Sequence, residues 1–190
     1  MTEIAIIHHS GYGHTHRQAE HVGRGVTKAG ATLHLLTIDA EGNLPPEDWD
    51  VILQADGVLF GSPTYMGAAS WQFKKFADAS SKAWFSMAWK DKFAGGFTNS
   101  ASVNGDKFNT ITYFITLAMQ HGMAWVGTAQ MPANTKAATR DDLNWIGGYS
   151  GALAQSPSDA SVDEMRPGDL ATAEAFGERF ATFVAAHKKA

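Results

Sequence analysis

Two glycines and several polar side chains follow the first apolar segment of the sequence. The segment Ser10–Thr15, Ser-Gly-Tyr-Gly-His-Thr, comes shortly after the β-branched run Glu3–His8. Glycines permit a tight turn and a close approach of the main chain, and amide groups at the start of a following helix attract an anion. The third glycine of a dinucleotide fingerprint and the Gly-Lys-Ser/Thr of a P-loop are absent. The segment therefore indicates either a site for a phosphate monoester or an ordinary turn between a strand and a helix.

Two further loops have side chains suited to a flat ring. The segment Gly61–Gly67, Gly-Ser-Pro-Thr-Tyr-Met-Gly, presents an aromatic ring and a methionine at its tip. The segment Thr98–Gly105 is small and polar, and its main-chain amides could bond the edge of a heterocycle. Each segment is an ordinary loop when taken alone. Together with the phosphate loop they predict a site for a mononucleotide, and the flat ring suggests FMN.

Strands and helices alternate along the chain that carries these loops. Short apolar runs predict strands, and apolar residues at helical spacing predict the helices between them. The predicted strands are Glu3–His8, Thr32–Ile38, Gly57–Gly61, Phe93–Thr98 and Met123–Val126, and the predicted helices cover residues 15–29, 45–54, 69–81, 108–120 and 170–187. This order predicts an α/β sandwich with a parallel sheet, because parallel neighbours need helical crossovers. In open sheets of this kind ligands bind beyond the carboxyl ends of the strands, and the three loops follow strands one, three and four.

We expect residues 1–190 to form one domain with an irregular insert at about 127–168. This interval is rich in Gly, Ser, Ala, Asp and Pro and shows little periodicity. A segment of that length without regular structure is usually a lid or an interface arm, or else it is disordered.

The composition excludes several classes of function. Cysteine is absent, which removes disulfides, thiol nucleophiles and iron–sulfur clusters, so a redox function would need a bound cofactor. The net charge of −4 argues against binding to nucleic acid or to an anionic membrane. Apolar runs long enough for a membrane span and a signal peptide are both missing, which predicts a cytoplasmic protein. Four histidines lie near the first loop without carboxylates at ligand spacing, so we expect no metal; they are His8, His9, His14 and His16.

The segments Ser10–His14 and Gly61–Gly67 resemble the FMN loops of the WrbA-type NAD(P)H:quinone oxidoreductases, in the flavodoxin-like superfamily. His121-Gly122-Met123 resembles a third element of that family, and the resemblance runs over most of the chain. It implies a flavodoxin-like three-layer sandwich with a five-stranded parallel sheet in the order 2-1-3-4-5. It also implies an enzyme that passes electrons from NADH or NADPH through bound FMN to quinones or similar acceptors.

Carried over by position, the resemblance implies a set of residues that bind FMN. These are Ser10, Gly11, Tyr12, Gly13, His14, Thr15, Pro63, Thr64, Tyr65, Met66, Gly67, Thr98, Asn99, Ser100, Ala101, Ser102, Asn104 and His121. His121 and Tyr65 are the expected catalytic residues, as donors to the oxygen of the acceptor, and Trp84 and Tyr12 are expected to contact the substrate. Two of these residues have ordinary structural alternatives: His121 can bond carbonyl groups at a helix end, and Trp84 can pack in a core or an interface.

Three features depart from the family pattern, and one of them is a shorter segment between the second and third predicted strands. The loop Asn99–Asn104 is not rich in glycine, and Tyr65 stands where many members carry arginine. They bear on the nicotinamide preference and on the electron acceptor. The alternatives to a quinone reductase are a flavodoxin-type electron carrier that serves a protein partner and a non-catalytic flavodoxin-like regulatory domain.

We also expect a homodimer or homotetramer in which a neighbouring subunit closes the flavin site. Charged residues make up 18% of the chain, which is below average. Trp84, Phe85 and Trp89 lie together just before the fourth predicted strand. Closed symmetry is the usual arrangement of soluble assemblies.

Overall fold

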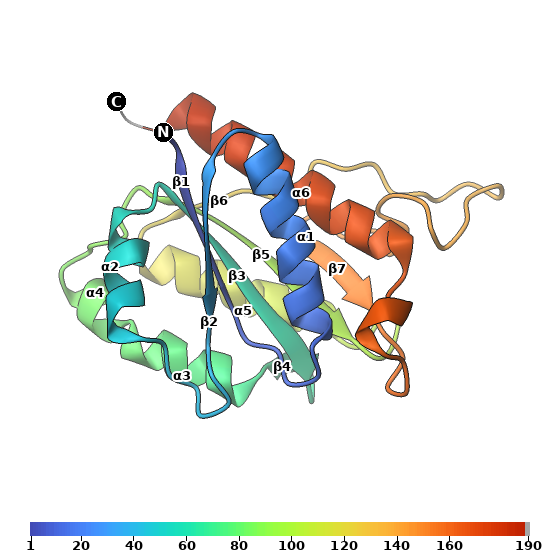
Figure 1. Cartoon of the computed structure of the whole chain (residues 1–190), viewed down its shortest axis with the longest axis horizontal. Helices are drawn as coiled ribbons and strands as arrows, with labels where there is room; N and C mark the ends of the chain where they lie inside the picture. Colours follow the sequence, from blue (N-terminus) through green and yellow to red (C-terminus); the bar gives the residue numbers. More distant parts are fainter. Residues whose placement is uncertain (189–190) are drawn as a thin grey trace.

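The computed structural model describes residues 1–188 as a parallel sheet between two layers of helices (Figure 1). The strands are β1 (Glu3–His8), β2 (Thr32–Thr37), β3 (Gly57–Tyr65), β4 (Ala68–Ala69), β5 (Phe93–Ser100), β6 (Ala124–Trp125) and β7 (Ala152–Gln155). The helices are α1 (His14–Lys28), α2 (Pro46–Gln54), α3 (Trp71–Ala79), α4 (Ser81–Phe85), α5 (Lys107–Gln120), the short 3₁₀ helix η1 (Val162–Glu164) and α6 (Pro167–His187).

The main sheet has the strand order β2-β1-β3-β5-β6, and its neighbouring strands are parallel. The short strand β4 is an antiparallel addition to β3. Once β4 is set aside, the observed order is the expected 2-1-3-4-5, which confirms the flavodoxin-like α/β fold. The carboxyl ends of β1, β3 and β5 consequently lie next to one another.

The two faces of the sheet are covered by different helices. Along β1, Ile6 faces the core formed with α1 and α6, whereas Ile7 faces the core formed with α2, α3 and α5. The first core includes Val22, Leu59, Phe97, Phe176 and Phe180, and the second includes Ile52, Phe60, Phe73, Phe76 and Phe114. Burial on both faces explains why the strand sequences are continuously apolar rather than alternating.

The third strand is longer than predicted. We expected it to end before Ser62-Pro63, but β3 continues to Tyr65, and Pro63 pairs with Asn99 of β5. The pairing of β3 with β1 ends at Gly61, so Pro63 lies beyond the end of β1. The missing amide proton of proline therefore breaks no hydrogen bond between these two strands.

The strand position next to β5, at the edge of the sheet, is filled by two separate segments. β6 pairs with the start of β5, at Phe93 and Ala94, and β7 pairs with its end, from Phe97 to Ser100. The chain between them leaves the sheet as a long arm, on the right of Figure 1. The prediction of an irregular interval over 127–168 is therefore wrong for residues 152–155 and 162–164, and for the start of α6. Four strand residues and a single 3₁₀ turn are too short to show a period in the sequence.

Most helices lie within about two residues of their predicted positions. One exception is the helix predicted over 69–81, which ends at Ala79 and is followed by the separate short helix α4. Trp71 is largely exposed at the start of α3. Among residues 1–188, no helix has both the length and the apolar character that crossing a bilayer requires.

Candidate functional site

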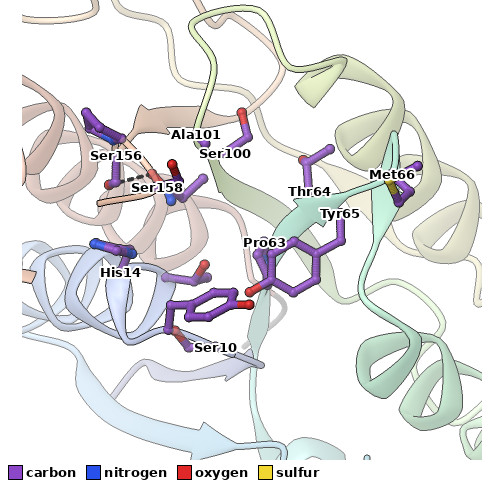
Figure 2. Close-up of a pocket in the computed structure, with 14 residues that line it drawn as sticks. Ser10, His14, Pro63, Thr64, Tyr65, Met66, Ser100, Ala101, Ser156 and Ser158 are labelled. Carbon is purple, nitrogen blue, oxygen red and sulfur yellow. Dashed lines mark hydrogen bonds between the residues drawn. The ribbon is translucent and has the colours of Figure 1, made fainter. Parts of the chain in front are cut away.

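A pocket of about 520 Å³ opens at the carboxyl ends of β1, β3 and β5 (Figure 2). This volume is typical of sites for small molecules and cofactors. The residues that line it are Ser10, Tyr12, His14, Thr15, Pro63, Thr64, Tyr65, Met66, Asn99, Ser100, Ala101, Ser156, Pro157 and Ser158. The three predicted loops thus meet in one pocket, at the edge of the sheet where ligands of open α/β sheets bind.

One end of the pocket is the start of α1. The residue before the helix is Gly13, which has a φ of 89°, and no side chain within residues 1–188 caps the helix. The amide groups of the first turn can therefore bond an anion, which the helix dipole also favours. A side chain at Gly13 would be strained at this φ and would meet Cγ1 of Val162 at 2.8 Å. The hydroxyl side chains of Ser10 and Thr15 line the same end.

The opposite side of the pocket is the hairpin between β3 and β4. Its turn is Met66-Gly67, with φ angles of 47° and 80°. Figure 2 shows Thr64, Tyr65 and Met66 on the side away from His14. A proline, an aromatic ring and a thioether therefore form the more apolar part of the lining, as the sequence predicts.

Beneath this side lies a buried network of hydroxyl groups. The Oγ1 atom of Thr64 is 2.8 Å from those of Thr98 and Thr110. The side chain of Thr98 is therefore engaged behind the wall, and Thr98 does not line the pocket. Its expected contact with the cofactor is not supported, because its hydroxyl group points to the network.

The end of β5 forms the third wall, through Asn99, Ser100 and Ala101. The neighbouring Ser102 and Asn104, also expected to contact the cofactor, lie in an exposed turn outside the lining. Gly105 in that turn has a φ of 53°, and a Cβ atom there would overlap Oγ of Ser100. Of the remaining expected residues, Gly11, Gly13 and Gly67 shape the main chain without lining the pocket.

Sequence reasoning missed a fourth wall, Ser156–Ser158. The hydroxyl of Ser156 donates to Oδ1 of Asn99 at 3.0 Å, and its amide donates to the carbonyl of Ser100 at 3.1 Å. Farther along, Nε2 of His14 bonds the carbonyl of Ala160 at 2.9 Å and ties this segment to α1. The signal was the sequence Ser-Pro-Ser one residue after the short apolar run Ala152–Ala154, which resembles Ser62-Pro63-Thr64 after the third predicted strand.

Tyr65 connects two walls of the pocket. The amide of Gly11 donates a hydrogen bond to the Tyr65 hydroxyl, and burial raises the pKa of this phenol above its usual value. The ring of Tyr12 stands edge-on to the ring of Tyr65, with 6.1 Å between their centroids. Both tyrosines predicted at the site therefore lie at its mouth.

His121 lies away from the pocket, at the opposite edge of the sheet. It follows the last turn of α5, next to Met123-Ala124, where β6 pairs with the start of β5. Its ring is 1% exposed, stacks on Trp89 at 4.1 Å, and bonds Oγ of Ser80 through Nε2 at 2.9 Å. Burial lowers the pKa of His121 to about 4. Contact with FMN or an acceptor is therefore not supported, because the imidazole is enclosed by its own subunit.

Trp84 also lies outside the pocket. It belongs to α4, is 43% exposed, and packs edge-on to Phe85 at 6.0 Å between ring centroids. Phe85 is 86% exposed. Within one chain Trp84 does not line the pocket, so its expected contact with the substrate would depend on a neighbouring subunit.

A family model described as NADPH-dependent FMN reductase matches residues 3–138. The chain belongs to this family. The match confirms the expected class of activity, an NAD(P)H-dependent oxidoreductase that uses FMN. It spans the phosphate loop, the hairpin and the end of β5, but not the fourth wall at Ser156–Ser158.

Individual relatives agree with this assignment. "Flavodoxin FldP" of Pseudomonas aeruginosa is 49% identical over 181 residues, which cover 95% of this chain and 96% of that protein. An "NAD(P)H dehydrogenase (quinone)" of Geobacter sulfurreducens is 32% identical over 143 residues, 65% of this chain and 70% of that protein. The crystal structure of a WrbA-like flavodoxin from Agrobacterium tumefaciens shares 49% identity and covers 99% of this chain and 100% of its own, with a TM-score of 0.78.

The residues of the pocket fit FMN in both size and chemistry. The uncapped start of α1 and the hydroxyls of Ser10 and Thr15 match a phosphate monoester. Pro63, Tyr65 and Met66 supply surfaces for a flat ring, and no metal ion is needed for either contact.

Proposed function

We propose that this pocket binds FMN and that the flavin carries electrons from NADH or NADPH to quinones. One observation carries this proposal: the uncapped start of α1, which suits a phosphate, and the β3–β4 hairpin, which suits a flat ring, line the same pocket. Relatives named NAD(P)H dehydrogenase (quinone) support quinones as the class of acceptor.

The phosphate of FMN is assigned to the segment Ser10–Thr15. Its contacts are the amides at the start of α1 and the hydroxyls of Ser10 and Thr15, with His14 at the rim. The isoalloxazine ring is assigned to the space between the hairpin and Asn99–Ala101. Ser156–Ser158 closes the side between the two.

FMN held between the segment Ser10–Thr15 and the β3–β4 hairpin would supply a ring that can take up a hydride from a nicotinamide and give two electrons to a quinone, which would take up two protons and become a hydroquinone. The chain itself has to bind, orient and shield these reactants. Tyr65 and Tyr12 lie at the mouth, where they border the face that nicotinamide and quinone would approach in turn. The Tyr65 hydroxyl remains our candidate donor to the oxygen of the acceptor, because a phenol is protonated at neutral pH and burial raises the pKa of Tyr65 further.

A flavin spectrum tests the proposal directly. The purified protein, or apoprotein mixed with FMN, is mixed under argon with NADH or NADPH in a stopped-flow instrument. We expect the oxidised flavin band to disappear, and to return when a quinone is added. A bound flavin that neither nicotinamide reduces would contradict the proposed activity.

The second candidate is an electron carrier, favoured by the similarity to a protein named flavodoxin. A carrier would be reduced by a reductase protein and not directly by a nicotinamide. The same stopped-flow experiment, repeated with a flavodoxin reductase in place of NADH or NADPH, separates the two functions.

We also propose a homodimer or homotetramer that uses the surface around α4. Trp84, Phe85 and Met87 are exposed there together, and apolar residues grouped on a surface commonly mark an interface. In such an assembly Trp84 of a neighbouring subunit would border the flavin site.

A further inference from the structure

Lys107 is a buried cation directly behind a wall of the pocket. It is the first residue of α5, and its side chain is 1% exposed. Lysine is rarely buried so completely, because the charged form loses its hydration. Lys107 was not among the residues expected at the site.

All three protons of its ammonium group have acceptors. Nζ lies 2.8 Å from Oγ of Ser100, 2.7 Å from the carbonyl of Ser102 and 2.8 Å from the carbonyl of Val103. Since Ser100 lines the pocket, the positive charge is one hydrogen bond behind the lining. The same three bonds fold the turn at 101–104 back onto the start of α5.

The stability of α5 does not account for a cation at this position. The start of a helix carries partial positive charge, which disfavours lysine in the first turn. Burial lowers the pKa of Lys107 to about 8, Asp169 of α6 raises it, and Arg140 of the arm lowers it further. The exposed carboxylate of Asp106 precedes Lys107 in the chain. At neutral pH the group is therefore mostly protonated, with its deprotonation within reach of mildly alkaline pH.

We propose that Lys107 is a positioning residue that holds the ring-side wall and stabilises the negative charge of reduced FMN. The proposal rests on the proposed function, because it requires the isoalloxazine ring to lie against Asn99–Ala101. Two-electron reduction adds negative charge to the flavin ring. A fixed cation behind Ser100 lowers the free energy of that reduced form more than that of the neutral oxidised form.

The experiment compares the dissociation constants of oxidised and reduced FMN. Apoprotein is titrated with each form at pH 7, for the wild type and for Lys107→Gln, which retains hydrogen-bond donors without the charge. We expect the variant to bind reduced FMN at least tenfold more weakly relative to oxidised FMN, equal to a fall of about 30 mV in midpoint potential for two electrons. Lys107→Arg, which retains the charge, should restore most of the ratio.

The matched control is Lys92→Gln at the opposite edge of the sheet. Lys92 also donates to main-chain carbonyls, those of Leu53 and Ala55, and burial also lowers its pKa. Its replacement should leave the ratio of the two dissociation constants unchanged. The inference would be overturned if Lys107→Gln bound oxidised and reduced FMN more weakly by the same factor, or if neither dissociation constant changed.

The wild-type protein alone provides a second test that does not depend on how the variants fold. If reduced flavin favours protonated Lys107, reduction raises the pKa of this lysine, and an additional proton is taken up per two electrons just above pH 8. The midpoint potential should therefore fall more steeply with pH above 8 than below it, and a constant slope would overturn the inference. Failure of the wild type to bind FMN would instead contradict the proposed function.

Discussion

The main-chain amide of Gly11 donates a hydrogen bond to the hydroxyl oxygen of Tyr65. A Cβ atom at Gly11 would lie 2.6 Å from that oxygen, so the Tyr65 side chain reaches across the mouth of the pocket to the phosphate loop. The two loops that we assign to opposite ends of FMN are joined directly by this contact. A phosphate group at the loop would therefore compete with the Tyr65 hydroxyl for the same amide.

Replacing Tyr65 by phenylalanine removes this competition. We expect Tyr65→Phe apoprotein to bind FMN about fivefold more tightly, because one net hydrogen bond amounts to about 1 kcal/mol. Quenching of FMN fluorescence measures the dissociation constant. Tyr12→Phe is the matched control, since Tyr12 contacts Tyr65 through the ring edge. Weaker binding by Tyr65→Phe would show instead that the hydroxyl is a ligand of FMN.

The phosphate assignment is tested at Gly13. Gly13→Glu should abolish uptake of FMN, because it adds a side chain and a negative charge at the start of α1. Gly30→Glu is the control: Gly30 also has a positive φ, of 77°, but it has open space around it and lies past the other end of α1. We expect both variants to lose some stability to backbone strain, and only Gly30→Glu to retain FMN. Unchanged FMN affinity in folded Gly13→Glu would refute the assignment.

Three walls of the pocket could be predicted from the sequence because each lies at, or just beyond, the carboxyl end of a buried strand. The chain cannot reach the next element without passing the carboxyl edge of a parallel sheet, so Ser10–Thr15, Pro63–Met66 and Asn99–Ala101 had to converge. The fourth wall depends on β7 pairing with β5 across more than fifty residues. Four strand residues carry too little pattern to predict that pairing.

The position of His121 could have been corrected from the topology. A crossover helix that begins at the carboxyl edge of a parallel sheet ends at the amino edge. His121 ends such a helix and therefore lies far from the loops, whatever its residue type suggests. Lys107 could not have been identified in this way, because its burial depends on the turn at 101–104 and not on any local pattern.

Acid should destabilise the protein through its buried histidines. Burial holds the pKa of His121 at about 4 against 6.5 for an unperturbed histidine, so the unfolded chain binds a proton that the folded chain does not. Neutral, buried His121 therefore makes its full contribution to the free energy of unfolding above pH 6.5. This contribution, about 3 kcal/mol at most, is lost as the pH falls from 6.5 toward 4. Burial lowers the pKa of His8 as well, to about 3, and adds to the same trend.

His121→Phe tests both this pH dependence and the role of the residue. Phenylalanine can keep the stacking on Trp89, and the Ser80 hydroxyl retains its hydrogen bond to the carbonyl of Ala77. We expect urea unfolding to show a smaller loss of stability between pH 7 and pH 4.5 than in the wild type. The FMN-loaded variant should still be reduced by NAD(P)H. The control is His187→Phe, at an exposed position, which should match the wild type in both the pH dependence of unfolding and the rate of flavin reduction. Slow reduction of a folded, FMN-loaded His121→Phe variant would restore a catalytic role for His121.

The proposed subunit interface is tested at the tip of α4. Phe85→Asp places a charge among the exposed residues Trp84 and Met87, and we expect sedimentation at micromolar concentration to show a 20.4 kDa monomer in place of an oligomer. Thr182→Asp adds the same charge to the exposed side of α6, which covers the other face of the sheet, and should leave the assembly intact.

Trp84→Ala then separates an interface role from a role in the reaction. Trp84 is 43% exposed in the single chain, so its truncation should change the stability of that chain by less than about 1 kcal/mol. If a neighbouring Trp84 borders the flavin, the variant should retain FMN while the rate of flavin reduction by NAD(P)H or of reoxidation by a quinone changes. A wild type that sediments only as a monomer would contradict the assembly. If Trp84→Ala remains an oligomer and its kinetics are unaltered, Trp84 has a packing role only. A residue that touches the reactants cannot be truncated without altering their binding or the rates of their reactions.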